Sequence, residues 1–172
     1  MIEFFVRNAK ENEFLTIGEL MVKVYSQLEG FPNEKEQVEY YDKLRNIGEI
    51  LKIDGAELLV AVSSENKIAG AVVYFNDLKQ YGPGGIASNE TDSSGFRLLA
   101  VDSEFRGKGI AKILIDECLN KAKANKHKQV IIHSTKSMQI AWKMYKKLGF
   151  KRSEDLDFMQ GKLAVFGFRL KI

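Results

Sequence analysis

Two glycines two residues apart lie between a short apolar run, Phe96–Val101, and a long amphipathic segment. They are Gly107 and Gly109, within the stretch Arg106–Ala111. Glycine leaves the backbone N–H groups open, and the first N–H groups of a helix have no intrahelical acceptor, at the end where the macrodipole is positive. The arginine of this stretch and the following Lys112 add positive charge. The pattern predicts a strand, a glycine loop and a helix whose first turn holds a phosphate or diphosphate.

Two familiar phosphate loops do not fit this spacing. A Walker A loop needs a lysine and then a hydroxyl residue after its last glycine, whereas Lys108 precedes Gly109 and no hydroxyl residue follows. A dinucleotide-binding fingerprint needs Gly or Ala three residues after its second glycine, but that position is Lys112. A nucleotide-binding hydrolase stays as an alternative, and it would be stabilised by ATP with magnesium.

The spacing Arg-x-x-Gly-x-Gly/Ala, met by Arg106, Gly109 and Ala111, resembles the acyl-CoA loop of the GNAT superfamily of N-acetyltransferases. The segment Leu98–Asp102 is similar to the fourth strand of that family, and Ala141–Phe150 is similar to its Ala-x-x-x-Tyr-x-x-x-Gly-Phe segment. Both motifs occur in the order of the family, with a predicted strand between them. The resemblance implies direct transfer of an acetyl group from acetyl-CoA to a primary amine of a small molecule or protein, without a metal.

The resemblance also implies where acetyl-CoA binds. The pantetheine arm would pair with the backbone of the fourth strand, and backbone N–H groups of the glycine loop would take the diphosphate. The family often has an asparagine at the position of Met138, and a nearby serine could replace the hydrogen bond that methionine cannot make. The cofactor-binding residues implied in this way are Leu99, Ala100, Val101, Arg106, Gly107, Lys108, Gly109, Ile110, Ala111, Lys112, Ser137, Met138 and Ala141.

Tyr145 matches the tyrosine that, in this family, donates a proton or hydrogen bond to the departing CoA thiolate. A thiol has a pKa near 8.5, so its thiolate leaves readily and this help is useful rather than indispensable. The alternative for Tyr145 is a core aromatic on the same helix face as Ala141 and Leu148. The rival function is a catalytically silent CoA-binding sensor or interaction module, which the departures from the family pattern at Gly95 and Met138 allow.

Removing a proton from the amine is the harder step. An alkylammonium has a pKa near 10.4, so only about one molecule in a thousand is neutral at pH 7. Related sequences often have a glutamate at the start of the fourth strand, but Gly95 and Phe96 occupy that region here. His133, on the predicted fifth strand, is the nearby side chain whose unperturbed pKa suits a base, and a structural histidine is the alternative. Further candidates for the base are Asp92, Glu90 and Glu29.

Arg97 alternates with Leu98 on the fourth strand. If its guanidinium faces the cleft, it suits a substrate that carries a carboxylate or phosphate. The alternative is a surface or structural ion pair.

Apolar periodicity predicts the elements around these motifs. A helix capped by Asn8 and a second helix follow the first strand, and in the family these two helices and their connection form a wall of the acceptor site. The single cysteine, Cys118, lies on an apolar helix stripe, which indicates a core residue rather than a nucleophile. The predicted strands are 4–6, 58–62, 68–75, 96–101, 129–133 and 164–172. The predicted helices are 8–28, 34–51, one after the glycine loop with its apolar stripe over 111–122, and 138–148.

Residues 77–94 lack any period and are rich in Gly, Ser, Asn and Asp. Such a long connection is either a functional lid or substrate loop, or a tolerated surface insertion. Its central segment, 82–85, contains three glycines that would allow a hinge.

The chain has 172 residues, of which 45% are hydrophobic, and one cysteine. These values predict one domain over residues 1–172, with the α/β class in an α+β three-layer form. We expect a GNAT-like mixed, mostly antiparallel central sheet of about seven strands, with helices on both faces. The apolar runs are too short to cross a bilayer and the first residues lack a secretory pattern, so we expect a cytoplasmic location.

The net charge is +3, and the lysines are distributed along the chain rather than gathered with aromatic residues. This distribution does not indicate nucleic-acid binding. The expected partners are acetyl-CoA and an amine acceptor, with no membrane. The apolar C-terminal strand could pair or swap between two copies in a homodimer.

Overall fold

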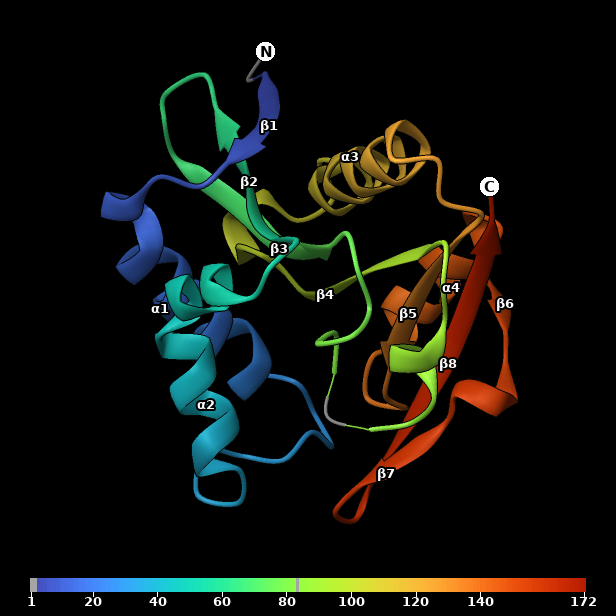
Figure 1. Ribbon diagram of the computed structural model, residues 1–172. Helices are drawn as coiled ribbons and strands as arrows, with labels where there is room; N and C mark the ends of the chain where they lie inside the picture. Colours follow the sequence, from blue (N-terminus) through green and yellow to red (C-terminus); the bar gives the residue numbers. More distant parts are fainter. Residues whose placement is uncertain (1–2, 83) are drawn as a thin grey trace.

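The computed structural model describes residues 3–82 and 84–172, which are built around one mixed sheet (Figure 1). Its strand order is β1-β2-β3-β4-β5-β8-β6, and β7 pairs with β8. The one parallel pair in this sheet of the described residues is β4 with β5. The strands are β1 (Phe4–Asn8), β2 (Ala56–Ser63), β3 (Ile68–Phe75), β4 (Ser93–Val101), β5 (Gln129–Ser134), β6 (Lys151–Arg152), β7 (Phe158–Gln160) and β8 (Leu163–Lys171).

Four α-helices cover the sheet in the described residues. The helices α1 (Phe14–Ser26) and α2 (Val38–Arg45) pack on one face, and α3 (Ile110–Ala124) and α4 (Gln139–Lys147) pack on the other (Figure 1). The predicted three-layer architecture with a mostly antiparallel sheet is confirmed, with eight strands instead of about seven. No helix within 3–82 and 84–172 combines the length and the apolar character needed to cross a membrane.

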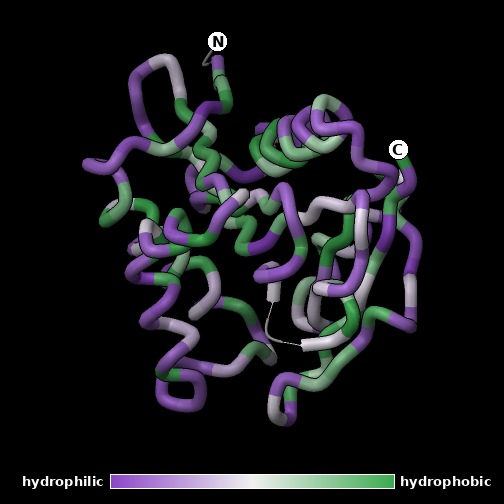
Figure 2. Tube along the Cα trace, in the orientation of Figure 1, coloured by the Kyte–Doolittle hydropathy of each residue, from purple (hydrophilic) through white to green (hydrophobic). Residues whose placement is uncertain are grey.

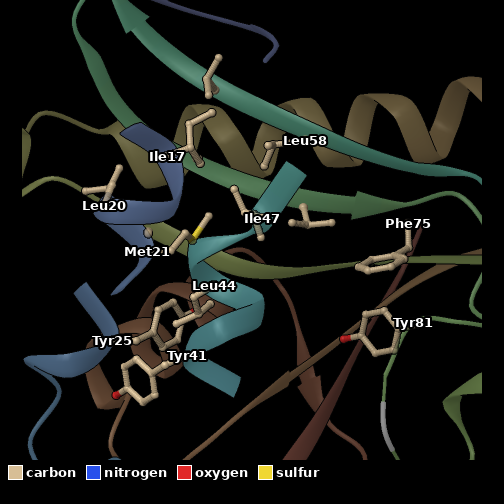
Figure 3. Close-up of a cluster of buried hydrophobic side chains, with 14 of the residues drawn as sticks. Ile17, Leu20, Met21, Tyr25, Tyr41, Leu44, Ile47, Leu58, Phe75 and Tyr81 are labelled. Carbon is tan, nitrogen blue, oxygen red and sulfur yellow. The ribbon is translucent and has the colours of Figure 1, made fainter. Parts of the chain in front are cut away.

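The strand β2, which lies between β1 and β3, is apolar at consecutive positions because both of its faces are covered. Leu58 and Val60 belong to the core under α1 and α2, whereas Leu59 and Ala61 belong to the core under α3 and α4. Successive side chains of a strand point to opposite faces, so a strand covered on both faces is apolar throughout. Figure 3 shows the first of these cores. Figure 2 shows hydrophobic and hydrophilic residues alternating along α3, as expected of a helix with one face on such a sheet.

Two predictions for the N-terminal helices are wrong. Asn8 does not cap a helix, because it ends β1 and its side chain donates a hydrogen bond to Glu57, 3.1 Å away. The predicted helix 34–51 is instead α2 followed by a 3-10 helix, Ile47–Lys52. This 3-10 helix packs closely on α1, since a Cβ added at Gly48 would lie 2.3 Å from the ring of Phe14.

The sequence analysis missed β6 and β7, which are two and three residues long. A two-residue turn joins β7 to β8, and its Gly161 has a φ of +60°. Glycine at such a position is a typical hairpin signal, so this turn was detectable from the sequence. The C-terminal strand β8 pairs with β5 over residues 166–171, with β6 at Phe168 and Arg169, and with β7 over residues 163–165. The predicted pairing with a second copy stays a prediction.

The connection between β3 and β4 is packed into the protein. It contains a 3-10 helix, Ala87–Asn89, and β4 starts at Ser93, within the predicted loop. Leu78 and Tyr81 are buried in the core next to α1 and α2. Leu78, Tyr81 and Ala87 thus anchor the connection, while most of its other described residues are exposed. Part of the predicted hinge, Pro83, lies outside the described residues.

Candidate active site

The parallel strands β4 and β5 separate at the centre of the sheet. They are paired only where Ser93–Gly95 lies beside Gln129–Ile131. Beyond this point β4 is irregular, with a φ of +57° at Leu98, and its register with β3 shifts. A β-bulge of this kind bends a strand and ends its pairing. The divergent halves of both strands line a cavity of about 760 Å³.

The glycine loop lies at one end of this cavity. Gly107 and Gly109 have φ values of +74° and +79°, and Gly109 is the N-cap of α3. The first helical hydrogen bond of α3 runs from the N–H of Ile113 to the carbonyl of Gly109, 3.1 Å away. The N–H groups of residues 110–112 precede it and have no acceptor within the helix. The loop therefore has the backbone geometry of an anion site, as predicted from its glycines.

Most residues of the predicted site line the same cavity. Two do not. Ala100 is buried in the core next to α1, and the ammonium of Lys108 lies over the ring of Phe105, 5.2 Å from its centroid. The predicted residues that line the cavity are Leu99, Val101, Arg106, Gly107, Gly109, Ile110, Ala111, Lys112, Ser137, Met138, Ala141, Tyr145, His133 and Arg97.

Two of these residues have side chains that are already engaged. The ammonium of Lys112 lies 2.6 Å from the carboxylate of Asp116, one helical turn further along α3. The hydroxyl of Ser134 donates to the sulfur of Met138, 3.4 Å away, at the start of α4. Arg106 is exposed beside the loop. An anion at the loop would therefore meet the backbone N–H groups first, with side-chain charge as a supplement.

Tyr145 lies on α4 and lines the cavity with only 6% of its surface exposed. Its ring packs against Phe96 and Phe150, with centroids 6.1 and 5.8 Å away. No hydrogen bond joins its hydroxyl to another described residue, and burial raises its pKa. The helix α4 ends two residues before Gly149, whose φ of +96° fits the predicted stop. Tyr145 is thus a neutral hydroxyl donor facing the cavity.

His133, at the end of β5, has both ring nitrogens within hydrogen-bond distance of neighbours. Nε2 lies 3.0 Å from the carbonyl oxygen of Leu156, and Nδ1 lies 3.2 Å from the hydroxyl of Tyr81. A carbonyl only accepts, so Nε2 carries the hydrogen and Nδ1 accepts the hydrogen of the Tyr81 hydroxyl. Burial lowers the pKa of His133 below 6.5, and the nearby Arg97 acts in the same direction. The imidazole is therefore neutral at pH 7.

Arg97 faces the cavity from β4. Its guanidinium donates to the backbone carbonyl of Tyr81, 2.8 Å away, and lies 5.7 Å from the centroid of that ring. Among the described residues it forms no ion pair, and its role in substrate binding stays a prediction. A guanidinium without a carboxylate partner, at the wall of a cavity, can bind an anionic ligand.

The wall opposite the glycine loop is aromatic. Tyr25, Phe31 and Tyr40 lie on α1, α2 and their connection, with ring centroids 5.6 to 6.0 Å apart. The Tyr25 hydroxyl donates to the carbonyl of Leu99, 3.3 Å away, and so joins this wall to β4. The prediction that these helices wall the cavity is confirmed. Sequence analysis missed the individual aromatic residues, because core and cavity aromatics have the same helical spacing.

The other candidate bases differ in position. Glu29 lines the cavity, whereas Glu90 pairs with Arg169, 2.7 Å away, on the far side of β5. Asp92 is paired with Lys128 at the surface. Two cavity residues that the sequence did not single out are Phe158 and Thr135, and the buried Thr135 hydroxyl has no hydrogen-bond partner among the described residues.

Cys118 is fully buried between α3 and the sheet. Burial raises the pKa of its thiol, so the thiolate form is suppressed. This is the environment of a core residue, as predicted. The ring of Trp142, on α4, packs edge-to-face on Phe166 and Phe168.

The sequence profile of a known protein family matches most of this chain. The profile described as the acetyltransferase (GNAT) family matches residues 21–150. This stretch contains the glycine loop, both separated strands and Tyr145.

Two curated proteins that are similar to part of the chain are both named N-acetylaspartate synthetase. The protein from Danio rerio is 41% identical over 66 residues, which are 38% of this chain and 23% of that protein. The protein from Xenopus tropicalis is 42% identical over 55 residues, which are 32% of this chain and 20% of that protein. The similarity thus spans less than a quarter of the length of these relatives.

Solved structures share the fold over nearly the whole chain. A GNAT-family acetyltransferase from Staphylococcus aureus Mu50 superposes with a TM-score of 0.74, covering 98% of this chain and 99% of that one, at 15% identity. The PaiA N-acetyltransferase from Thermoplasma acidophilum, solved in complex with coenzyme A, has a TM-score of 0.72, with 96% and 98% covered, at 15% identity. Identities this low establish the fold alone.

Proposed function

Because this chain belongs to the acetyltransferase (GNAT) family, we propose that it transfers an acetyl group from acetyl-CoA directly to a primary amine. The observation that carries this proposal is a single cavity that joins the glycine loop, the separated ends of β4 and β5, and the Tyr145 hydroxyl. These are an anion site, an open strand edge and a proton donor, which are the groups needed to hold a CoA thioester and release its thiolate.

In this proposal the backbone N–H groups of residues 106–111 bind the diphosphate of CoA, with Arg106 or Lys112 adding charge. The backbone of Leu99–Val101 pairs with the pantetheine arm, because β5 leaves that edge of β4 free. Ser137, Met138 and Ala141 lie along the same arm. Tyr145 protonates the departing thiolate, and the aromatic wall of α1 and α2 encloses the acceptor.

The charged residues of the cavity wall favour an acceptor amine that also carries a carboxylate. Arg97 supplies a guanidinium to the cavity, and Glu29 is the one carboxylate among the described residues that line it. A polycationic acceptor would need several carboxylates, whereas an amino acid could place its own carboxylate on Arg97. The relatives named N-acetylaspartate synthetase carry in their name an acetylated amine with carboxylates, which supports this class of acceptor.

The test incubates the purified protein with acetyl-CoA and a panel of amines, with and without a carboxylate, and measures free CoA thiol. We expect thiol release above hydrolysis, highest with carboxylate-bearing amines. Binding of CoA by calorimetry without turnover on any amine would instead favour the CoA-binding sensor. Thermal stabilisation by ATP with magnesium, and none by CoA, would favour the nucleotide hydrolase.

Three further parts of the proposal concern the whole protein. We infer that residues 1–172 act as one acetyltransferase domain, which limited proteolysis tests. The cytoplasmic location is tested by cell fractionation. The homodimer stays a prediction, although much of β8 already pairs with β5, β6 and β7 within the chain, and sedimentation measures the oligomeric state.

A further inference from the structure

Tyr81 lies in the connection before β4, and its ring fills a space that a glycine leaves open. A Cβ added at Gly95 would lie 2.8 Å from the Tyr81 ring and 2.6 Å from the carbonyl oxygen of Ile131. The ring also packs edge-to-face on Phe75, with centroids 5.4 Å apart, as Figure 3 shows. Arg97 holds the Tyr81 backbone carbonyl from β4. These contacts fix the position of Tyr81 with 2% of its surface exposed.

The fixed ring directs its hydroxyl hydrogen to one acceptor. The Tyr81 hydroxyl lies 3.2 Å from Nδ1 of His133, and the two rings lie 5.5 Å apart. The opposite nitrogen of the imidazole donates to the carbonyl of Leu156. Tyr81 and His133 both line the cavity. Because the hydroxyl donates to His133, its oxygen lone pairs are available to accept a proton from a group in the cavity.

We propose that Tyr81 and His133 form a relay that takes the proton from the acceptor ammonium, an inference that rests on the proposed acetyl transfer. The Tyr81 oxygen accepts a proton from the ammonium while the Tyr81 hydroxyl proton moves to Nδ1 of His133. The freed nitrogen lone pair bonds to the acetyl carbon, and the C–S bonding pair leaves with the CoA sulfur, which takes a proton from Tyr145. The nitrogen still carries a second proton after the C–N bond forms; this proton passes through water to the Tyr145 phenolate, and the His133 imidazolium releases its proton to water. Both residues are then restored, and one proton is released per acetyl transfer.

The charged groups around His133 keep its imidazole neutral and so able to accept a proton. Arg97 faces it from β4 and Arg169 from β8, and both disfavour the imidazolium. Asp157, which follows the 3-10 helix Glu154–Leu156, favours the imidazolium. Burial, together with the two arginines, lowers the pKa of His133, so the imidazole is neutral at pH 7. The Leu156 carbonyl then stabilises the imidazolium when it forms.

The relay predicts a specific dependence of kcat on pH. When the relay works, an acceptor bound as ammonium loses its proton inside the complex, so kcat is nearly constant between the pKa of His133 and that of the amine. Without the relay only amine that is already neutral reacts. The rate then rises about tenfold per pH unit towards the amine pKa, since the neutral fraction rises by that factor.

The experiment compares Tyr81→Phe and His133→Gln with the matched control Tyr74→Phe, in acetyl transfer to the best amine of the panel. Tyr74 is a buried tyrosine on β3 in the opposite core, and its hydroxyl has no hydrogen-bond partner among the described residues. Each protein is assayed from pH 6 to pH 10. Acetyl-CoA affinity by calorimetry and the melting temperature are measured in parallel, to separate loss of the relay from loss of the fold.

We expect kcat at pH 7 to fall about 100-fold or more in Tyr81→Phe and in His133→Gln, with CoA affinity retained and the gap closing towards pH 10. The double variant should be no slower than either single variant, because the two residues act as a unit. If Tyr81→Phe does not fold, the His133→Gln profile decides. A flat profile with wild-type kcat in either folded variant overturns the relay. Absence of transfer by the wild-type protein overturns the proposed function instead.

Discussion

Tyr145 combines two properties that matter at the scale of a single residue. Its ring is buried among Phe96, Phe150 and Phe168, so its orientation is fixed. Its hydroxyl is neutral, because burial raises its pKa. A fixed neutral hydroxyl can donate a hydrogen bond to the developing thiolate at no cost in reorganisation.

We predict that Tyr145→Phe lowers kcat for acetyl transfer by about tenfold or more and leaves acetyl-CoA affinity nearly unchanged. The ring contacts stay, and only the proton donor is lost. Steady-state kinetics with thiol detection measures kcat, and calorimetry measures the affinity. Unchanged turnover would remove Tyr145 from the chemistry and leave it as a core aromatic.

Arg97 is predicted to bind the carboxylate of the acceptor. In Arg97→Gln, KM for a carboxylate-bearing amine should rise about tenfold to 100-fold, because a charge-assisted hydrogen bond is lost. The same amine with its carboxylate converted to an amide is the control, and its KM should change little. An equal rise in KM for both acceptors would contradict carboxylate recognition and indicate that Arg97 acts by holding Tyr81.

At the scale of elements, the glycine loop and the start of α3 form one unit. Gly109 has a φ of +79° and no atom within 4 Å of an added Cβ, so its conformation, rather than crowding within the protein, requires glycine. A valine side chain there would strain the backbone by roughly 1–2 kcal/mol and would cover the N–H groups that face the cavity.

We therefore predict that Gly109→Val weakens CoA binding at least about tenfold, which calorimetry measures. Gly161→Val is the matched control, because Gly161 also has a positive φ and open space around it, in the turn between β7 and β8. The control should lose similar stability and keep its CoA affinity. Normal CoA affinity in Gly109→Val would count against the loop as the diphosphate site.

At the scale of the whole molecule, buried and paired titratable groups make stability depend on pH. The folded protein holds the proton of His133 less tightly than the unfolded chain does, since burial lowers its pKa below 6.5. The hydrogen bond from Arg7 lowers the pKa of Glu13 below 4.5 in the folded protein. Both groups bind more protons in the unfolded state, so stability rises with pH through each range.

We predict that the free energy of unfolding falls between pH 7.5 and pH 5.5, as His133 titrates, and falls further below pH 4.5, as Glu13 titrates. The His133 contribution is complete above pH 6.5 and is lost as the pH falls through the folded-state pKa. Urea unfolding at these pH values measures the change. A His133→Gln variant should lose less stability from pH 7.5 to pH 5.5, and an equal loss would contradict the assignment.

Local spacing along the chain was enough to predict several parts of the fold. The glycines of the loop, the apolar stripe of α3 and the motif ending at Gly149 predicted a strand, an anion loop and the helix carrying Tyr145, because their backbone and side-chain preferences act within a few residues. The alternating apolar run of β8 likewise predicted a strand.

The contacts between distant segments became known only from the tertiary structure. Gly48, in the 3-10 helix after α2, packs against Phe14 of α1, and the bulge at Leu98 comes with the separation of β4 from β5. The pair of Tyr81 and His133 joins residues 52 positions apart. Such contacts depend on how elements pack across the sheet, which residue spacing along one segment does not encode.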